Sequence, residues 1–328
     1  MKKISHFRIS LKISLFFTVL SLITGTYSWS QPEVKIVPTQ EKPRIDGRIT
    51  EPLWQKAATI DQFFQREPDT GEPISKETIV YLCYDKDFLY LAFRCYDKPG
   101  EITAKELARD VSLGEDDRVQ IIFDTFLDHR NAYWFQIGPL GSIGDAVVSE
   151  NGAAFNKQWD GLWEGKAFIH EQGWDAEMKI PFKSLKFKAG QSTWGLKIIR
   201  HIRRRLESAY WPVANLDTYK FQVSDAGLLT GLEGITQGIG LDINPYGLAG
   251  IDHVQGTKDQ YMADAGLDVF YQLTPGLTSA LTINTDFAQT EVDSRQINLT
   301  RFNLHFPEKR EFFLDGANYF HFGLTGSA

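Results

Sequence analysis

The sequence predicts an all-β protein, an antiparallel β-sandwich followed by a second group of longer strands. From Val34 to about Ile235, short runs of β-branched and aromatic residues alternate with turn signals, as in a sandwich. Near residue 236 the runs lengthen and glycine becomes frequent. The chain has 328 residues, more than one typical core holds, so we expect two domains.

The first 30 residues have the features of a removable secretory signal. The apolar run ISLFFTVLSLITG is shorter than the roughly 20 residues with which an α-helix spans a bilayer. Small residues at Ser28 and Ser30 match the positions that a signal peptidase reads. Four basic residues precede the run: Lys2, Lys3, Arg8 and Lys12. We therefore predict export. Removal of the segment takes the formal charge from −7 to −11, which argues against nucleic acid as a partner.

The strands expected in the sandwich follow one another along the chain. Leu89 to Tyr96 is apolar on both faces, which favours a central strand. One helix is predicted at residues 101–110, EITAKELARD, because good helix formers precede the turn at Gly114. The expected strands are residues 78–84, 88–97, 117–125, 133–139, 163–171, 173–181, 193–202 and 228–235.

The two cysteines, Cys83 and Cys95, are expected to be buried thiols. Export would permit a disulfide between them. A hairpin turning at residues 85–87, however, places Cys83 opposite Leu89, and Cys95 then lies about 20 Å farther along the same strand on the same sheet face. That separation is too large for a disulfide.

Residues 236–328 read as a different kind of sheet. The runs GIGLDINPYGLAGI, AGLDVFYQL and LTSALTINTDF alternate apolar with small or polar residues, and a TPG turn joins the last two. Strands of roughly ten residues with this alternation fit an outer-membrane β-barrel. They fit a soluble antiparallel sheet equally well, and periodicity alone leaves both open.

Three segments resemble carbohydrate-binding modules of family 9. They are KPRIDGRITEPLWQKA at 42–57, EDDRVQIIFDT at 115–125 and GWDAEMKIPFKSL at 173–185, and they occur in the order of that family. The resemblance covers nearly all of residues 34–235. It implies that residues 31–235 form a family 9-like carbohydrate-binding β-sandwich.

A fourth segment, residues 283–320, resembles the signature of a largely uncharacterised bacterial family. Members of that family place a family 9-like domain before an outer-membrane-type β-barrel. The resemblance implies that residues 236–328 are the N-terminal part of a membrane-type β-barrel. Only three or four strands fit into these residues, whereas a barrel needs at least about eight. We therefore expect a fragment of a longer protein, or a barrel completed elsewhere.

The family resemblance also implies a ligand site. In family 9 modules two tryptophans sandwich a terminal sugar, and a Glu and an Arg on adjacent strands bind its hydroxyls. Here Leu113-Gly114 replaces one tryptophan, and Gln120 and Gln136 correspond to the charged pair. Trp211 and Tyr219 are candidates for the opposite wall. Because neutral hydrogen bonds are weaker than charge-assisted ones, we expect weaker binding of free sugar ends or a different ligand.

The stretch QWDGLWEG, residues 158–165, has three interpretations. Trp159 and Trp163 straddle Gly161, so the stretch reads as a loop entering a strand, in which Trp163 packs inward and Trp159 closes the end of the sandwich. Alternatively, Trp159 stacks on a ligand. A catalytic role would need Asp160 and Glu164 about 5–9.5 Å apart, a spacing that many acidic pairs meet. We favour packing.

Other chemistry finds little support in the sequence. The histidines lack the spacing of a zinc site, and neither a Gly-x-Ser-x-Gly elbow nor a phosphate-binding glycine loop occurs. The acidic residues at 115–117, with Asp124 and Asp128, form either a solvated turn or a structural Ca²⁺ site. No other cofactor is expected. The basic run HIRRRLES, residues 201–208, serves either ordinary surface pairing or contact with an anionic glycan or lipid headgroup.

These observations lead to one functional expectation and two alternatives. We expect a non-catalytic sandwich that binds a carbohydrate or another envelope ligand. It would lie at the outer-membrane surface or in the periplasm, tethered by the barrel strands. One alternative is a part of a glycan-processing system with hydrolase activity on O-glycosyl bonds. The other is a docking domain for envelope assembly.

Overall fold

The computed structural model describes residues 31–284, apart from residues 158, 237–240, 253–259 and 275–276. Within this part the chain is all-β, as predicted, and its only helical elements are short 3-10 turns. None of the described helical turns has the length and apolar character needed to cross a membrane. The expected signal segment and residues 285–320 of the long motif lie outside the described residues.

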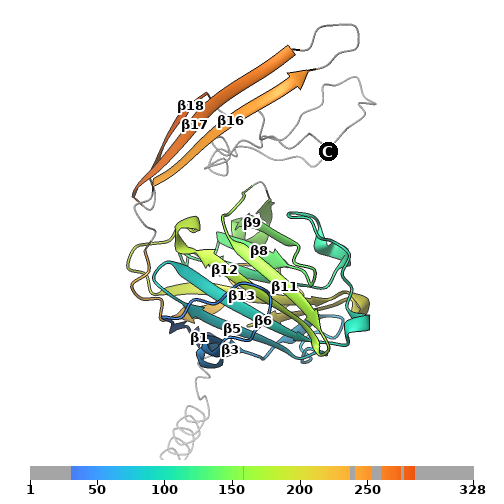
Figure 1. Cartoon of the computed structure of the whole chain (residues 1–328). Coiled ribbons are helices and arrows are strands. Elements are labelled where there is room, and N and C mark those ends of the chain that lie inside the picture. Colours follow the sequence, from blue (N-terminus) through green and yellow to red (C-terminus); the bar gives the residue numbers. More distant parts are fainter. Residues whose placement is uncertain (1–30, 158, 237–240, 253–259, 275–276, 285–328) are drawn as a thin grey trace, which may run out of the picture. The chain divides into compact units, whose positions relative to one another are not determined.

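Two sheets form the sandwich (Figure 1). The six-stranded sheet has the order β11-β12-β6-β5-β2, with β3 also on β5: β2 Val37–Pro38, β3 Ala58–Ile60, β5 Thr78–Tyr84, β6 Phe88–Tyr96, β11 Glu164–His170 and β12 Gly173–Pro181. The nine-stranded sheet has the order β1-β15-β13-β7-β8-β9-β10, with β14 bridging β13 and β4: β1 Glu33–Lys35, β4 Phe64–Glu67, β7 Arg118–Asp124, β8 Ala132–Ile137, β9 Ile143–Ser149, β10 Ala154–Asn156, β13 Thr193–Ile202, β14 Glu207–Trp211 and β15 Gly227–Thr230.

The strand pairs are antiparallel, with two exceptions at the edges. β1 runs parallel to β15, and β2 runs parallel to β5. Six 3-10 turns connect the strands: η1 Pro52–Lys56, η2 Pro99–Glu101, η3 Leu113–Glu115, η4 Glu150–Gly152, η5 Phe182–Ser184 and η6 Arg203–Arg205.

The main core lies between the two sheets and follows the period of two expected of strands. On β7, Val119, Ile121 and Phe123 point inward, and they meet β12 residues such as Trp174 and Met178 from the other sheet. All five are completely buried. The alternation that predicted these strands is therefore the alternation that fills the core.

Each strand predicted in the sandwich is present, and β5, β12 and β13 have the predicted bounds. The prediction missed β9 and β14, as well as the short strands β1 to β4 and β10. The sequence of β9, IGDAVVS, contains Gly144 and Asp145, two residues that are rare in strands.

The predicted helix at 101–110 is wrong. Its first residue, Glu101, closes the turn η2, and residues 102–107 form neither a helix nor a strand. The Asp116 carboxylate accepts the backbone N–H groups of Lys105 at 2.7 Å and Glu106 at 2.9 Å, and the Ser142 hydroxyl donates to the Ala108 carbonyl. These long-range bonds use backbone groups that a helix would pair internally.

Cys83 and Cys95 are buried free thiols, as predicted. The expected register is wrong by one residue, because Cys83 pairs with Tyr90 and not with Leu89. Such a slip moves a side chain to the other face of the sheet. Cys83 consequently packs on the outer face beside Trp54, whereas Cys95 lies in the main core.

A buried carboxylate, Glu177 on β12, binds the N-terminal segment to the outer face of the six-stranded sheet. It accepts the backbone N–H groups of Asp46 at 3.0 Å and Gly47 at 2.9 Å, and the Trp54 indole N–H at 3.1 Å. Gly47 has φ +83°, and a Cβ there would come within 2.6 Å of the Ala167 backbone. Burial raises the pKa of Glu177 to about 7, although the three hydrogen bonds oppose the shift.

A separate three-stranded sheet has the order β16-β17-β18: β16 Leu241–Asp252, β17 Gln260–Thr274 and β18 Leu277–Ile283. Directly paired residues share a face, so the register defines both faces. One face carries apolar side chains: Leu241, Ile243, Ile251, Tyr261, Leu267, Val269, Tyr271, Leu281 and Ile283. The other face is mixed and includes Asn244, Asp264, Asp268 and Thr282, whose hydroxyl donates to Asp268.

Replacement of Glu177 is expected to destabilise the sandwich. In Glu177→Ala three buried donors lose their acceptor, and we expect the free energy of unfolding to fall by about 2–4 kcal/mol. Glu164→Ala is the matched control, because Glu164 makes only an exposed pair with Lys179 and its loss is expected to cost less than about 0.5 kcal/mol. Denaturant unfolding followed by tryptophan fluorescence measures both. Equal stability of the two variants would contradict the role given to Glu177.

Candidate functional site

A row of polar side chains crosses the outer face of the nine-stranded sheet. His201 on β13, Gln120 on β7 and Gln136 on β8 lie on neighbouring strands. His201 Nε2 lies 3.0 Å from Gln120 Oε1. Gln120 Nε2 donates to Gln136 Oε1 at 3.5 Å, the upper limit of a hydrogen bond. The two predicted site glutamines are therefore direct cross-strand partners.

Local sequence explains this placement. Val119 and Ile121 point into the core, so alternation directs Gln120 to the outer face. Gly144 on the next strand, β9, leaves room for the Gln136 side chain. A Cβ at residue 144 would lie 2.9 Å from Gln136 Nε2. The Gln136 amide then donates to the Val111 carbonyl at 3.3 Å.

The same face carries an apolar cluster next to the polar row. Trp134, Ile122, Ile199 and Tyr210 belong to it, together with Val223 of the segment that follows β14. In this cluster the ring of Phe221 lies 6.1 Å from Trp134 and stacks on Phe155 at 5.0 Å. We call residues 212–226 the covering segment, since its side chains pack on this face.

Backbone groups of the covering segment bind cations of the sheet. Lys197 on β13 donates to the Gln222 carbonyl at 3.0 Å, and Arg66 on β4 donates to the Thr218 carbonyl at 2.8 Å. Burial lowers the pKa of Lys197 to about 8, and Asp225 partly opposes this effect. The segment is thus attached to the sheet by both apolar and polar contacts.

The five predicted ligand-binding residues do not come together on one surface. Gln120 and Gln136 share the outer face, but each is only 3% exposed. Tyr219 is 59% exposed and lies on the covering segment. Trp211 and Trp159 pack with the main core on the inner side of the sheet, so neither forms a wall beside the glutamines. Sequence reasoning missed the covering segment, whose turn-rich composition carries no signal of what it packs on.

The two tryptophans of residues 159–165 pack against the main core, as the packing interpretation predicted. The Trp159 ring lies 4.9 Å from Tyr133, and the Trp163 ring lies 5.3 Å from Phe135. The buried Asp145 carboxylate accepts the Gly161 backbone N–H at 3.0 Å and the Trp163 indole N–H at 2.8 Å. Burial raises the pKa of Asp145 to about 6, against the effect of these two bonds and of Arg109.

The acidic residues considered for catalysis or metal binding make other contacts. Asp160 pairs with Arg109, and Glu164 lies 3.7 Å from Lys179. Asp124 accepts the backbone N–H groups of Asp128 and His129. Among the described residues, no group of three or more His, Cys, Asp or Glu side chains has the arrangement of a metal site.

The arginines of the basic run at 201–208 pair with carboxylates, one exposed and two buried. Arg203 donates to Glu115 at 2.7 Å, Arg204 donates to Asp97 at 2.7 Å, and Arg205 donates to Glu207 at 3.0 Å. The ordinary pairing that we considered for these arginines therefore explains their positions. The residues form the turn η6 rather than a continuous strand.

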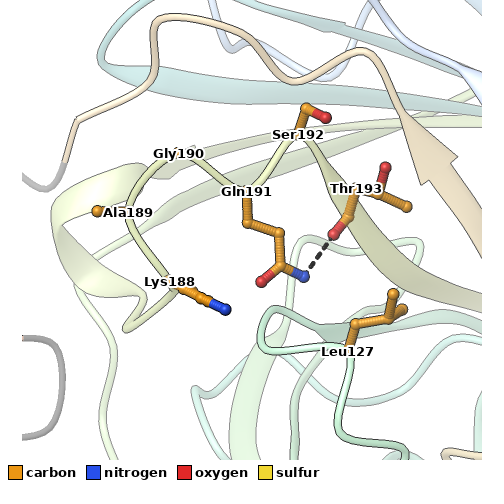
Figure 2. Close-up of a pocket in the computed structure, with 7 residues that line it drawn as sticks. All are labelled: Leu127, Lys188, Ala189, Gly190, Gln191, Ser192 and Thr193. Atoms are coloured by element: carbon orange, nitrogen blue, oxygen red, sulfur yellow. Dashed lines mark hydrogen bonds between the residues drawn. The ribbon is translucent and has the colours of Figure 1, made fainter.

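An open hollow of about 390 Å³ lies near the N-terminal end of β13 (Figure 2). Leu127 and residues 188–193 line it, and the Gln191 side chain crosses it to donate to the Thr193 carbonyl at 2.7 Å. None of the predicted site residues lines this hollow. It is a depression between two turns without a cluster of reactive groups.

Comparison with known families and proteins identifies one family model. Residues 238–324 match a family described as a domain of unknown function (DUF5916). The match begins where the sandwich ends and includes the three-stranded sheet. A comparison with curated proteins found no match.

Solved structures are similar to the sandwich. A family 9 carbohydrate-binding module from Caldicellulosiruptor kristjanssonii in complex with cellotriose is 14% identical over 61% of this chain and 93% of that chain, with a TM-score of 0.46. A candidate carbohydrate-binding protein from Bacteroides uniformis is 12% identical over 61% of this chain and 99% of that chain, with a TM-score of 0.51. The second similarity confirms the predicted sandwich fold.

Trp159 is expected to contribute to stability through packing. In Trp159→Ala the rings of Tyr133 and Phe135 lose a partner, so the free energy of unfolding should fall by about 2–4 kcal/mol. Leu162→Ala is the control, because that neighbouring side chain is 70% exposed and its loss should cost less than about 0.5 kcal/mol. Thermal and denaturant unfolding measure the two variants. A Trp159→Ala protein as stable as the parent would show that the ring is not part of the core.

Proposed function

We propose that residues 31–235 form a non-catalytic, exported module that binds carbohydrate. The observation that carries the proposal is the row of paired amides on the outer face of the nine-stranded sheet. Amide groups both donate and accept, as the hydroxyls of a sugar require. The exposed ring of Tyr219 on the covering segment offers an apolar surface for the C–H face of a sugar.

Two further observations support this proposal. The sandwich shares its fold with the Bacteroides uniformis protein, a candidate for carbohydrate binding. The segments that resemble family 9 modules meet in this fold, because Glu177 of the third segment binds Asp46, Gly47 and Trp54 of the first. Gln120 and Gln136 are buried. A ligand therefore reaches their amide groups only when the side chains and backbone that bury them move.

We also propose that the strands after residue 236 tether the module to the outer membrane as part of a β-barrel. The three-stranded sheet supports this with its apolar face, on which Ile243, Ile251, Leu281 and Ile283 are each more than half exposed. A lipid-facing surface has this character, and the mixed opposite face would line the lumen. Residues 1–30 would direct export as a cleaved signal.

Glycan binding by the purified full-length chain in detergent tests the first proposal. We expect the chain to bind members of a glycan array. Tyr219→Ala should weaken that binding about three- to tenfold, because a stacking ring is lost. Tyr219→Phe keeps the ring and should bind nearly as well. Unfolding curves show that both variants remain folded. A chain that binds no glycan would overturn the proposal and direct the search to protein partners in the envelope.

Membrane insertion tests the tether. Ile243→Arg places a charge on the apolar face, where an arginine in lipid costs about 2–4 kcal/mol. We expect this variant to be depleted from the outer-membrane fraction of cells. Asn244→Arg is the control, because its side chain lies on the opposite face, directly across from Asp268. Equal amounts of the two variants in the membrane would contradict the assignment of the faces.

A further inference from the structure

Three aromatic rings meet on the outer face of the nine-stranded sheet. Trp134 on β8 lies edge-to-face against Phe155 on β10, with ring centroids 5.0 Å apart. Phe221 of the covering segment stacks on Phe155 at 5.0 Å and lies 6.1 Å from Trp134. Trp134 is only 2% exposed, whereas Phe155 and Phe221 are half-buried. Phe221 therefore fills space beside Trp134 on the side toward solvent.

The Trp134 indole N–H has no hydrogen-bond partner. A buried donor without an acceptor is destabilising, and neither Phe155 nor Phe221 has a side-chain oxygen or nitrogen to accept it. The indoles of Trp174 and Trp194 also lack a partner, but both lie in the main core between the two sheets. Of the three, only Trp134 lies on an outer face, under a segment that a ligand can displace.

The polar row lies next to the Trp134 ring. Gln136 follows Trp134 by two residues on β8, so the two side chains share the outer face about 7 Å apart along the strand. In register, Gln120 lies directly across from Gln136, and Ile122 lies across from Trp134. A ligand on the indole would thus lie beside the two amides. An aromatic ring next to groups that both donate and accept suits a sugar.

Side chains, rather than strand pairing, hold the covering segment on the sheet. Asn151 accepts the backbone N–H groups of Val223 and Ser224, both at 2.9 Å, and Lys197 donates to the Gln222 carbonyl at 3.0 Å. The covering segment belongs to no strand of either sheet. Its displacement would therefore leave the pairing of the strands intact.

We propose that Phe221 occupies a sugar-binding position, and that a sugar takes its place on Trp134 when the covering segment withdraws. The proposal rests on the carbohydrate binding proposed above. The C–H face of the sugar stacks on the Trp134 ring, and one sugar hydroxyl accepts the indole N–H. Tyr219, which is exposed and precedes Phe221 by two residues, then contacts the sugar from the solvent side.

Removal of the Phe221 ring tests the proposal. Calorimetry of the full-length chain in detergent would use four neutral tetrasaccharides, of β-linked glucose, xylose, mannose and galactose. In Phe221→Ala the ring no longer competes for the position, so we expect the tightest of the four to bind about three- to tenfold more tightly. Leu216→Ala is the control, because this side chain of the same segment is 51% exposed and its loss should leave binding unchanged.

Loss of the indole N–H tests the role of Trp134. Trp134→Phe keeps an aromatic ring but removes the donor, so we expect the same tetrasaccharide to bind about three- to tenfold more weakly. Trp194→Phe is the control, because its unpartnered indole lies between the sheets and its replacement should leave binding unchanged. Unfolding curves show which variants fold, and the Phe221→Ala comparison decides the proposal if Trp134→Phe does not.

Hydrogen exchange detects the withdrawal of the segment. The hydrogen bonds from Val223 and Ser224 to Asn151 break when the segment withdraws. We therefore expect these two amide groups to exchange faster with the bound tetrasaccharide than without it. Slower exchange on binding would overturn the displacement, because a ligand that binds over a closed segment protects it.

The outcomes separate this inference from the function on which it rests. Binding by Phe221→Ala that is no tighter than by the parent, or by Trp134→Phe that is no weaker, overturns the sugar position and leaves carbohydrate binding intact. Binding of none of the four tetrasaccharides overturns this inference, and a glycan array without signal overturns the proposed function as well.

Discussion

The hydrogen bonds that the buried Glu177 carboxylate accepts hold the N-terminal segment on the sandwich. The carboxylate joins β12 to a segment about 130 residues earlier in the chain and satisfies two backbone N–H groups and the Trp54 indole. Trp54 and Leu53 then cover Cys83, Tyr90 and Ala92 on the outer face of the six-stranded sheet. This outer face is closed by the chain itself, and the candidate site lies on the outer face of the other sheet.

Asp145 acts in the same way at one end of the sandwich. Its carboxylate accepts a backbone N–H from Gly161 and the indole N–H of Trp163, as Glu177 does from Gly47 and Trp54. In both cases burial raises the pKa of the acid, so desolvation outweighs the hydrogen bonds in the balance between protonated and ionised forms. Each acid orders a loop whose tryptophan packs on the sandwich, Trp163 in one case and Trp54 in the other.

The proposed function uses the outer face of the nine-stranded sheet. There His201, Gln120 and Gln136 form a row of hydrogen-bonded polar groups, and residues 212–226 cover the apolar cluster on the same face. The covering segment also carries Tyr219, the exposed ring of the proposed site.

The sequence by itself determined the all-β class, the bounds of β5, β12 and β13, the free cysteines and the packing of Trp159 and Trp163 against the core. These properties depend on local alternation and on residue type, which neighbouring residues reveal. Gln120 and Gln136 were predicted from a family resemblance, and only the register of β7 and β8 showed that they pair.

Tertiary structure alone decided the remaining features. Hydrogen bonds to Asp116 took up backbone N–H groups of the predicted helix at 101–110, and one step of register moved Cys83 to the outer face. The covering segment packed on the same face of the sheet as the two glutamines. Each of these outcomes depends on partners far away in the chain, whose positions are fixed only when the sheets assemble.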